Sequence, residues 1–396
     1  MINSFITIFV YVRKFLNVKE KGKIMILDIS DNGFKQLLDD EKLYLPIRWD
    51  GVDFSKTLTE LFDYYISKIE NMVGKSKDYS VQNDLKRIKQ VCGLLTKTIN
   101  HYLNGFPSES YSTFKRVMNI LMGQQLKIYQ KSELEQFVDD ENLRNNYHDL
   151  KLFRVVSVDD IRPYVRARAF HTPYNLRSKV STSRYSIAGY PSLYLGTSLD
   201  LCYEEIHMNP YKTFALASIF KLERTIEYTN TNVKVIELGV KPQDFLDVSY
   251  INERSRRKIS YSLLQTTEVK SAYLLWYPII AACSYIRTNK SDPFAAEYII
   301  PQLLMQWVRN EMSYCVGEEY SELVGIRYFS CASVKASEMG FNYVFPTSGL
   351  QKSSELPYCS VLARLFKLTK PIYIHEFDSI ESCEDELMGL TDFDYI

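Results

Sequence analysis

The chain lacks an excess of charge of either sign. It contains 48 Lys plus Arg and 48 Asp plus Glu, so its formal net charge is zero. Proteins that bind the phosphate backbone of nucleic acids usually carry a basic excess on the binding domain. We therefore expect no nucleic-acid partner. A site for a phosphorylated small molecule needs only a few local arginines, and the charge balance is compatible with it.

Metal and disulfide signatures are also missing. The seven cysteines are scattered without a CxxC pair, and the five histidines show neither HxxxH nor HxH spacing. Structural zinc sites and disulfide frameworks depend on such clustered ligands. We predict reduced cysteines, no metal site and a cytoplasmic location, where thiols stay reduced.

No apolar stretch reaches the length of a membrane span. The apolar residues 5–12 (FITIFVYV) are followed by Arg13 and Lys14. A spanning helix needs about 20 apolar residues, and a signal peptide carries its positive charge before the apolar run. We expect neither an anchor nor a signal peptide, and Met25 is an alternative start to Met1.

The first part of the chain shows helical periodicity. A length of 396 residues suggests two domains. Amphipathic stripes cover residues 58–69, 85–102 and 114–121, and a capping-box sequence predicts a fourth helix from Ser132. The pattern predicts a helical bundle over residues 1–150, which we interpret as structural or partner-binding.

From residue 151 onward, strand-like and helical segments are mixed. The helix opened by Pro301 lies between the last two predicted strands, and the acidic tail from Glu381 to Asp394 is expected to be solvated. Without regular βαβ spacing, this order predicts an α+β fold rather than a doubly wound sheet. The predicted strands cover residues 152–156, 192–196, 217–222, 233–238, 274–280 and 324–329.

Residues 178–208 hold the most informative polar pattern. Arg184 lies in a Ser-rich turn before the strand that contains Tyr194, and Ser198 is placed to cap the next helix. At about 100° per residue, Glu205 lies at the edge of that helix's apolar stripe, whereas Glu204 points further away. Glu205 is therefore the candidate functional carboxylate, although two ordinary surface charges would give the same pattern.

The order of these residues resembles the RES domain family, bacterial toxins with an ADP-ribosyltransferase-like fold that degrade NAD. Arg184 is followed ten residues later by Tyr194, and eleven further on by Glu205, within SRYS and GYPSLYLGTSLDLCYEE. Two later segments, GIRYFS ending at Ser330 and NYVFP at 342–346, also resemble the family. The resemblance covers about residues 150–350. Ser183 and Tyr185 depart from the family's usual Gly and Trp.

The resemblance implies a helical, HEPN-like and non-catalytic extension over residues 1–150, followed by a RES-like NAD-cleaving domain over 151–396. It also implies a catalytic group and a set of helpers. The catalytic residues would be Arg184, Tyr194, Glu205 and Ser330, and the substrate-binding helpers Arg154, Arg168, Tyr185 and Ser186.

These residue types suit cleavage of the bond between nicotinamide and ribose. Positive charge develops on the ribose, as in glycoside hydrolysis, and a carboxylate such as Glu205 can stabilise it. Arg184 can bind the pyrophosphate as a fork of donors, and Tyr194 can stack on nicotinamide or hold the ribose. Ser330 would complete the hydrogen bonding around the ribose. The chain has no G-x-G-x-x-G turn, so NAD is expected as a substrate and not as a bound cofactor.

The acceptor and the partners stay open at this point. Water would make the chain an NAD glycohydrolase, inorganic phosphate as co-substrate an NAD phosphorylase, and a protein side chain an ADP-ribosyltransferase. The resemblance favours the first two and implies an antitoxin partner for a growth-arresting toxin. Two other readings are a non-catalytic sensor of NAD or ADP-ribose and a structural helical adaptor. The oligomeric state is not readable from the sequence.

Overall fold

The structure is a computed structural model of the 396-residue chain. It describes nine stretches of the chain. They are residues 31–74, 79–123, 151–206, 214–222, 234–245, 267–289, 291–314, 323–347 and 357–396. The helix predicted from Ser132 lies outside these residues.

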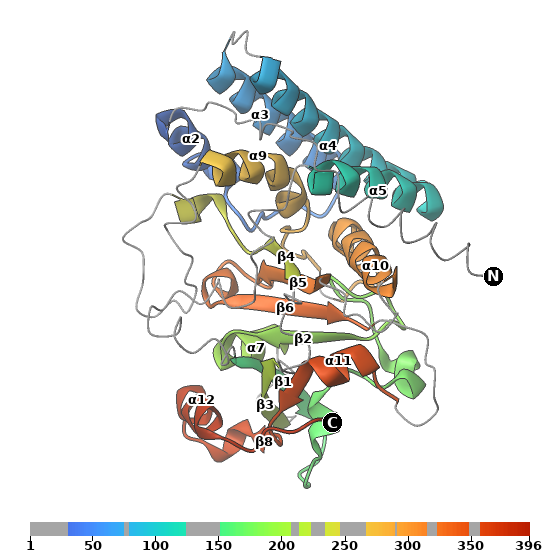
Figure 1. Ribbon diagram of the computed structural model, residues 1–396, viewed down its shortest axis with the longest axis vertical. Helices are drawn as coiled ribbons and strands as arrows, with labels where there is room; N and C mark the ends of the chain where they lie inside the picture. The colour runs from blue at the N-terminus through green and yellow to red at the C-terminus, as the bar shows by residue number, and fades with distance from the viewer. Residues whose placement is uncertain are drawn as a thin grey trace, which may run out of the picture.

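The N-terminal part is helical, as the periodicity predicted. Asp53 caps the first long helix, Phe54–Val73, by accepting a hydrogen bond from the backbone N of Lys56 at 2.9 Å, and the apolar stripes of the helices are buried. Figure 1 shows these helices together at one end of the molecule. The elements are α2 (Asp31–Leu38), η1 (Glu41–Leu43), α3 (Phe54–Val73), α4 (Tyr79–Leu103) and α5 (Pro107–Gly123).

The rest of the chain forms an eight-stranded mixed sheet, so the α+β class is confirmed. The order is β4-β5-β6-β2-β1-β3-β7, with β8 also paired to β3. Of the strand pairs, β4 with β5 is parallel, and the pairs that β1, β2, β3 and β6 form are antiparallel. The strands are β1 (Lys151–Val158), β2 (Ser192–Gly196), β3 (Phe214–Leu222), β4 (Lys234–Leu238), β5 (Leu323–Phe329), β6 (Phe341–Pro346), β7 (Phe366–Leu368) and β8 (Ile372–Tyr373).

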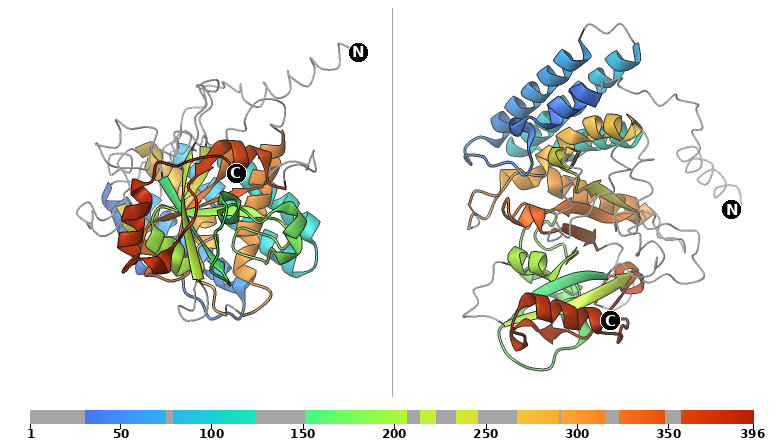
Figure 2. Two further views of the ribbon diagram at one scale, coloured as in Figure 1. Left: turned by 90° about the horizontal axis from the view of Figure 1, so that it is seen from below. Right: turned by 90° about the vertical axis from the view of Figure 1, so that its left-hand side faces the viewer.

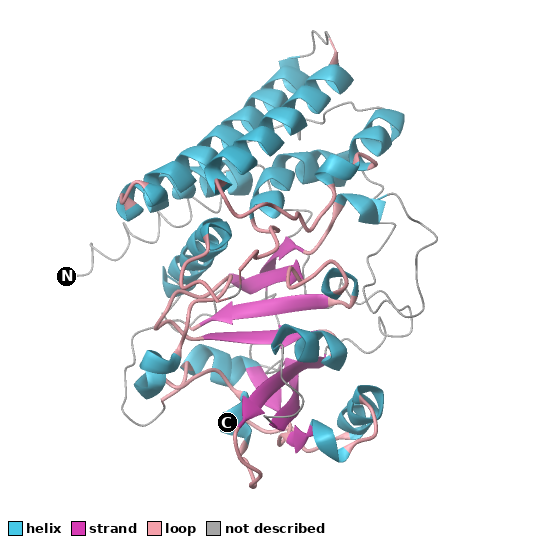
Figure 3. Cartoon of the chain, turned by 180° about the vertical axis from the view of Figure 1, so that it is seen from behind, coloured by secondary structure: helices cyan, strands magenta, loops and turns pink. Residues whose placement is uncertain are grey.

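Longer helices and short 3-10 turns connect and cover the strands. In Figure 3 the strands lie between the helical N-terminal end and the opposite end of the molecule, which carries α12. None of the described helices is long and apolar enough to cross a membrane. The helices are α7 (Leu199–Ile206), α9 (Thr267–Ala282), α10 (Ile299–Tyr314), α11 (Ser360–Leu365) and α12 (Ile380–Gly389). The 3-10 turns are η3 (Arg166–Ala169), η4 (Tyr174–Lys179), η6 (Pro242–Phe245), η7 (Ala296–Tyr298), η8 (Ala336–Glu338) and η9 (Ile374–Glu376).

The strand predicted at residues 274–280 is wrong, because this segment lies inside α9. A short apolar run has the same appearance in a buried strand and in a helix that is buried on every side. Here the run is buried along its whole length, and the hydroxyl of Tyr65 on α3 donates to the carbonyl O of Leu274 at 2.8 Å. Helix α9 is thus sandwiched between the N-terminal helices and the rest of the fold (Figure 2).

One continuous hydrophobic core joins the N-terminal helices to α9, α10 and the sheet. A smaller core lies between α7, β1, β3 and α12, where Cys383 and Leu387 are buried. The solvated tail expected from Glu381 to Asp394 is therefore wrong over α12. The spacing of Cys383 and Leu387 gives this acidic segment one apolar face, and that face packs against the fold.

Candidate active site

Helix α7 carries Glu205 and is held firmly at its first turn. The Ser198 hydroxyl accepts a hydrogen bond from the backbone N of Leu201 at 3.3 Å, so the predicted cap is confirmed. Glu384 of α12 adds a second acceptor, since its Oε2 lies 2.8 Å from the backbone N of Leu199. A Cβ at Gly196 would lie 2.6 Å from Cys202 Sγ, so glycine allows α7 to pack closely on the end of β2.

The Glu205 carboxylate is bound by two side chains from neighbouring strands. Its Oε1 accepts hydrogen bonds from the Ser330 hydroxyl and from Asn342 Nδ2, the latter at 2.8 Å. Ser330 directly follows β5, and its hydroxyl also accepts from the backbone N of Ala332 at 3.1 Å. Glu204 and Glu205 are both half-buried, so these bonds distinguish the two glutamates better than exposure does.

Tyr194 is held by the serine turn that surrounds Arg184. Its hydroxyl lies 2.7 Å from Ser183 Oγ and 2.8 Å from Ser186 Oγ. The two serines also exchange backbone hydrogen bonds, and Gln302 on α10 donates to both of their carbonyls. Burial raises the pKa of Tyr194 to about 12, so the phenol stays protonated at neutral pH.

Arg184 is buried and binds the backbone beyond α9. Its Nη1 donates to the carbonyl O of Cys283 at 3.1 Å and its Nη2 to that of Tyr285 at 2.8 Å. The guanidinium also lies 5.0 Å from the centre of the Tyr298 ring. Both terminal nitrogens therefore hold the protein's own chain, and the pyrophosphate contact expected of Arg184 stays a prediction.

One buried tyrosine that the sequence reasoning missed, Tyr328, interacts electrostatically with three of the four predicted catalytic residues. Burial raises the pKa of Tyr328 well above its usual value, the nearby Glu205 and Tyr194 raise it further, and Arg184 opposes them. Asn342, which begins the NYVFP segment but was assigned no role in the site, is the cross-strand partner of Tyr328. The sequence contained a signal for Tyr328. It lies two residues before Ser330, and residues two apart in a strand face the same side of the sheet.

The four predicted helpers have structural contacts. Tyr185 is buried, with its ring centre 4.6 Å from that of Tyr328, and Ser186 holds Tyr194. Arg154 Nη1 donates to the carbonyl O of Tyr194 at 3.0 Å, and Arg168 Nη2 donates to the carbonyl O of Ser157 at 2.7 Å. Their substrate-binding roles stay predictions, since the observed contacts hold the sheet and its loops together.

Two further features of the described part of the chain concern metal-ligating side chains and thiols. No group of three or more His, Cys, Asp or Glu residues there could hold a metal ion. The six described cysteines are buried and free. Burial raises the pKa of Cys202, next to the site, to about 12, so its thiol is protonated and a poor nucleophile.

The chain is similar in sequence to a bacterial protein. The chain is 28% identical over 358 residues to a protein described as "Putative toxin YopC" from Bacillus subtilis (strain 168). The alignment covers 88% of this chain and 72% of that protein, so the similarity extends into both the helical part and the sheet. No family model and no solved structure matches the chain.

Proposed function

We propose that this chain is a toxin that degrades NAD by cleaving the bond between nicotinamide and ribose. One observation carries the proposal: the Glu205 carboxylate is fixed by hydrogen bonds from the Ser330 hydroxyl and the Asn342 side-chain amide. The similarity to the protein described as "Putative toxin YopC" supports the biological part of the proposal.

The chemistry assigned to Glu205 is electrostatic. The bond from the ribose C1′ to the ring nitrogen breaks, its electron pair returns to nitrogen, and neutral nicotinamide leaves. The ribose becomes oxocarbenium-like, and an acceptor oxygen then bonds to C1′ and loses its proton. Because Ser330 and Asn342 both contact Oε1, we assign Oε2 to the developing positive charge. A carboxylate fixed in advance loses little free energy to reorientation during the reaction.

Tyr194 and Arg184 would bind the two groups of NAD on either side of the reacting ribose, namely nicotinamide and the pyrophosphate. The Tyr194 hydroxyl already contacts two serines, so we assign its ring face to nicotinamide. Arg184 contributes a buried positive charge, which favours the anionic pyrophosphate nearby even while its donors contact carbonyls.

The test is a product analysis with the purified chain and NAD, with and without inorganic phosphate. Free ADP-ribose beside nicotinamide identifies water as the acceptor, and ADP-ribose phosphate identifies a phosphorylase. ADP-ribose attached to protein identifies a transferase. NAD that binds without releasing nicotinamide under any of these conditions would overturn the proposal in favour of a sensor.

A further inference from the structure

A connecting segment of the N-terminal part, residues 44–49, lies between η1 and α3, and we refer to it as the strap. One side of the strap pairs with the chain that follows α9. The backbone N of Ile47 donates to the carbonyl O of Ser284 at 2.9 Å, and the backbone N of Ile286 donates to the carbonyl O of Ile47 at 2.8 Å. The strap therefore fixes the position of residues 284–286.

The same short segment supplies both acceptors of Arg184. Successive carbonyls of an extended chain point to opposite sides. The carbonyl of Ser284 thus points towards the strap, while the carbonyls of Cys283 and Tyr285 point towards Arg184. The segment is held between the strap and the arginine of the candidate site.

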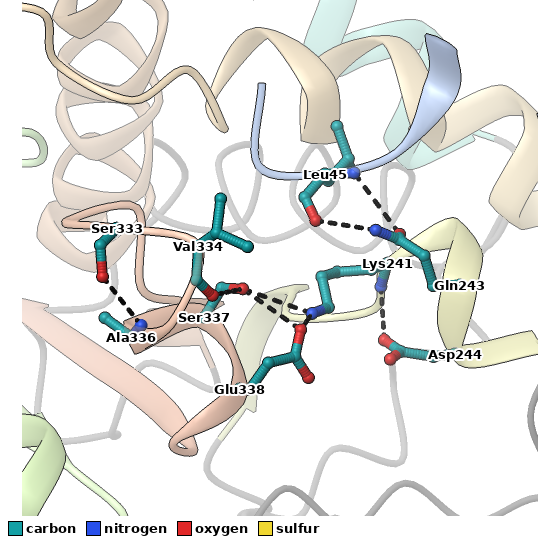
Figure 4. A network of polar contacts seen from close by, with 9 residues as sticks. All are labelled: Leu45, Lys241, Gln243, Asp244, Ser333, Val334, Ala336, Ser337 and Glu338. Atoms are coloured by element: carbon teal, nitrogen blue, oxygen red, sulfur yellow. Dashed lines mark hydrogen bonds and ion pairs between the residues drawn. The ribbon is translucent and has the colours of Figure 1, made fainter. Parts of the chain in front are cut away.

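The strap also contacts the chain that follows β4. Leu45 exchanges two hydrogen bonds with the Gln243 side chain, its N donating to Oε1 at 3.4 Å and its O accepting from Nε2 at 3.0 Å. Figure 4 shows this pair beside Lys241, whose buried side chain reaches across to Glu338 and to Ser337 Oγ.

The loop that receives Lys241 connects the two residues that bind Glu205. It begins after Ser330 at the end of β5 and ends before Asn342 in β6. Internal hydrogen bonds fold it compactly, including Ala336 N to Ser333 Oγ at 3.0 Å. The ion pair between Lys241 and Glu338 therefore ties this loop to the η6 turn, which carries Gln243.

We propose that the strap is a positioning device for the candidate site, acting on Arg184 through residues 283–286 and on Ser330 and Asn342 through Gln243 and Lys241. The helical N-terminal part then helps to position the residues of the site and is not an independent extension. The coupling itself follows from the contacts, and its effect on catalysis rests on the proposed function.

The test compares Gln243→Leu, which keeps the side-chain volume and removes both bonds to Leu45, with Ser110→Ala. Ser110 is the matched control because its buried hydroxyl donates to the carbonyl O of Thr98 at 2.8 Å, within the helical part and away from the strap. Hydrogen exchange is measured at the backbone amides of residues 335–339. We expect about tenfold faster exchange in Gln243→Leu and no change in Ser110→Ala, since two hydrogen bonds are lost.

A second variant tests the coupling from the other end without disturbing the core. Glu338 has a side chain that is 58% exposed, so Glu338→Gln should fold normally while weakening the pair with Lys241. We expect faster exchange at the Leu45 amide in this variant. Unchanged exchange at both ends would overturn the inference, whatever the chain does with NAD.

Measurement of nicotinamide release distinguishes the positioning role of the strap from the proposed NAD-cleaving function. If the strap is coupled to the site, Gln243→Leu should lower kcat about tenfold with little change in KM. The reason is that the residues of the site remain present but are less precisely positioned. Altered exchange in a chain whose wild type releases no nicotinamide would support the strap and overturn the proposed function. Altered exchange with an unchanged kcat would overturn the positioning role.

Discussion

The side-chain amide of Asn342 lies 2.8 Å from Oε1 of Glu205, and these residues are 137 positions apart in the sequence. The Ser330 hydroxyl donates to the same oxygen from the end of the neighbouring strand. A helix and two strands thus meet at one carboxylate, whose orientation is fixed before any ligand binds. The consequences of this arrangement can be measured one residue at a time.

Removing the Ser330 hydroxyl should impair turnover more than binding. A hydrogen bond to a charged group contributes roughly 1.5–3 kcal/mol, so we expect Ser330→Ala to lower kcat about 10- to 100-fold with KM nearly unchanged. Steady-state nicotinamide release measures both constants. Ser110→Ala is the control, because the buried Ser110 hydroxyl donates to the carbonyl O of Thr98 within the helical part, away from the site. Equal activity of the two variants would contradict the role of Ser330.

The two parts of Tyr194 should contribute differently. Since its hydroxyl is held by Ser183 and Ser186, we assign substrate contact to the ring. Tyr194→Phe should retain activity to within about tenfold, whereas Tyr194→Ala should lose roughly 100-fold or more, as expected when a stacking face is removed. The kcat/KM values of the two variants decide this. A Phe variant as inactive as the Ala variant would show that the hydroxyl acts directly.

Arg184 should stabilise the fold as well as the site. Lysine cannot bridge the carbonyls of Cys283 and Tyr285 with a planar fork, so Arg184→Lys should lower the free energy of unfolding by about 2 kcal/mol. Urea unfolding measures the change against Arg177→Lys, a control at a half-buried arginine that lies over the Tyr174 ring. An Arg184→Lys protein as stable as this control would show that the arginine serves ligand binding alone.

The fold should lose stability in mild acid through His171. This fully buried ring accepts a hydrogen bond from the backbone N of Cys359 through Nε2, and burial lowers its pKa to about 4. The unfolded chain binds a proton near pH 6.5, so the stabilising contribution is present above that pH. It is lost as pH falls from about 6.5 towards 4, by up to about 3 kcal/mol. Unfolding curves at pH 7 and pH 5 measure this loss.

The assignment can be checked on the ring itself. We expect NMR to show a neutral His171 imidazole with the proton on Nδ1 at pH 5.5, since Nδ1 lies 2.8 Å from the carbonyl O of Thr172. An imidazolium at that pH would contradict the account.

Local sequence patterns were sufficient for much of the fold. The bounds of β2 match the predicted residues 192–196, and Ser198 caps α7 as expected. Both depend on residues close together in the chain. The boundary between domains near residue 150 stays a prediction, since the core continues across it.

Contacts between distant segments could not be read from the sequence. The acidic tail looked solvated because Glu384 finds its partner, the backbone N of Leu199, 185 positions away. The acceptors of Arg184 are backbone carbonyls, which leave no mark on side-chain identity. Likewise, the apolar run in α9 fits either a strand or a helix until its neighbours are known.

The most direct test of the central claim is nicotinamide release from NAD by the wild-type chain and by Glu205→Gln, with NAD binding measured in parallel. Glutamine keeps the shape of the side chain and removes its negative charge. We predict that the variant still binds NAD but releases nicotinamide at least 100-fold more slowly, because stabilisation of the charged ribose is lost. Equal release by both proteins, or none by the wild type, would contradict the account.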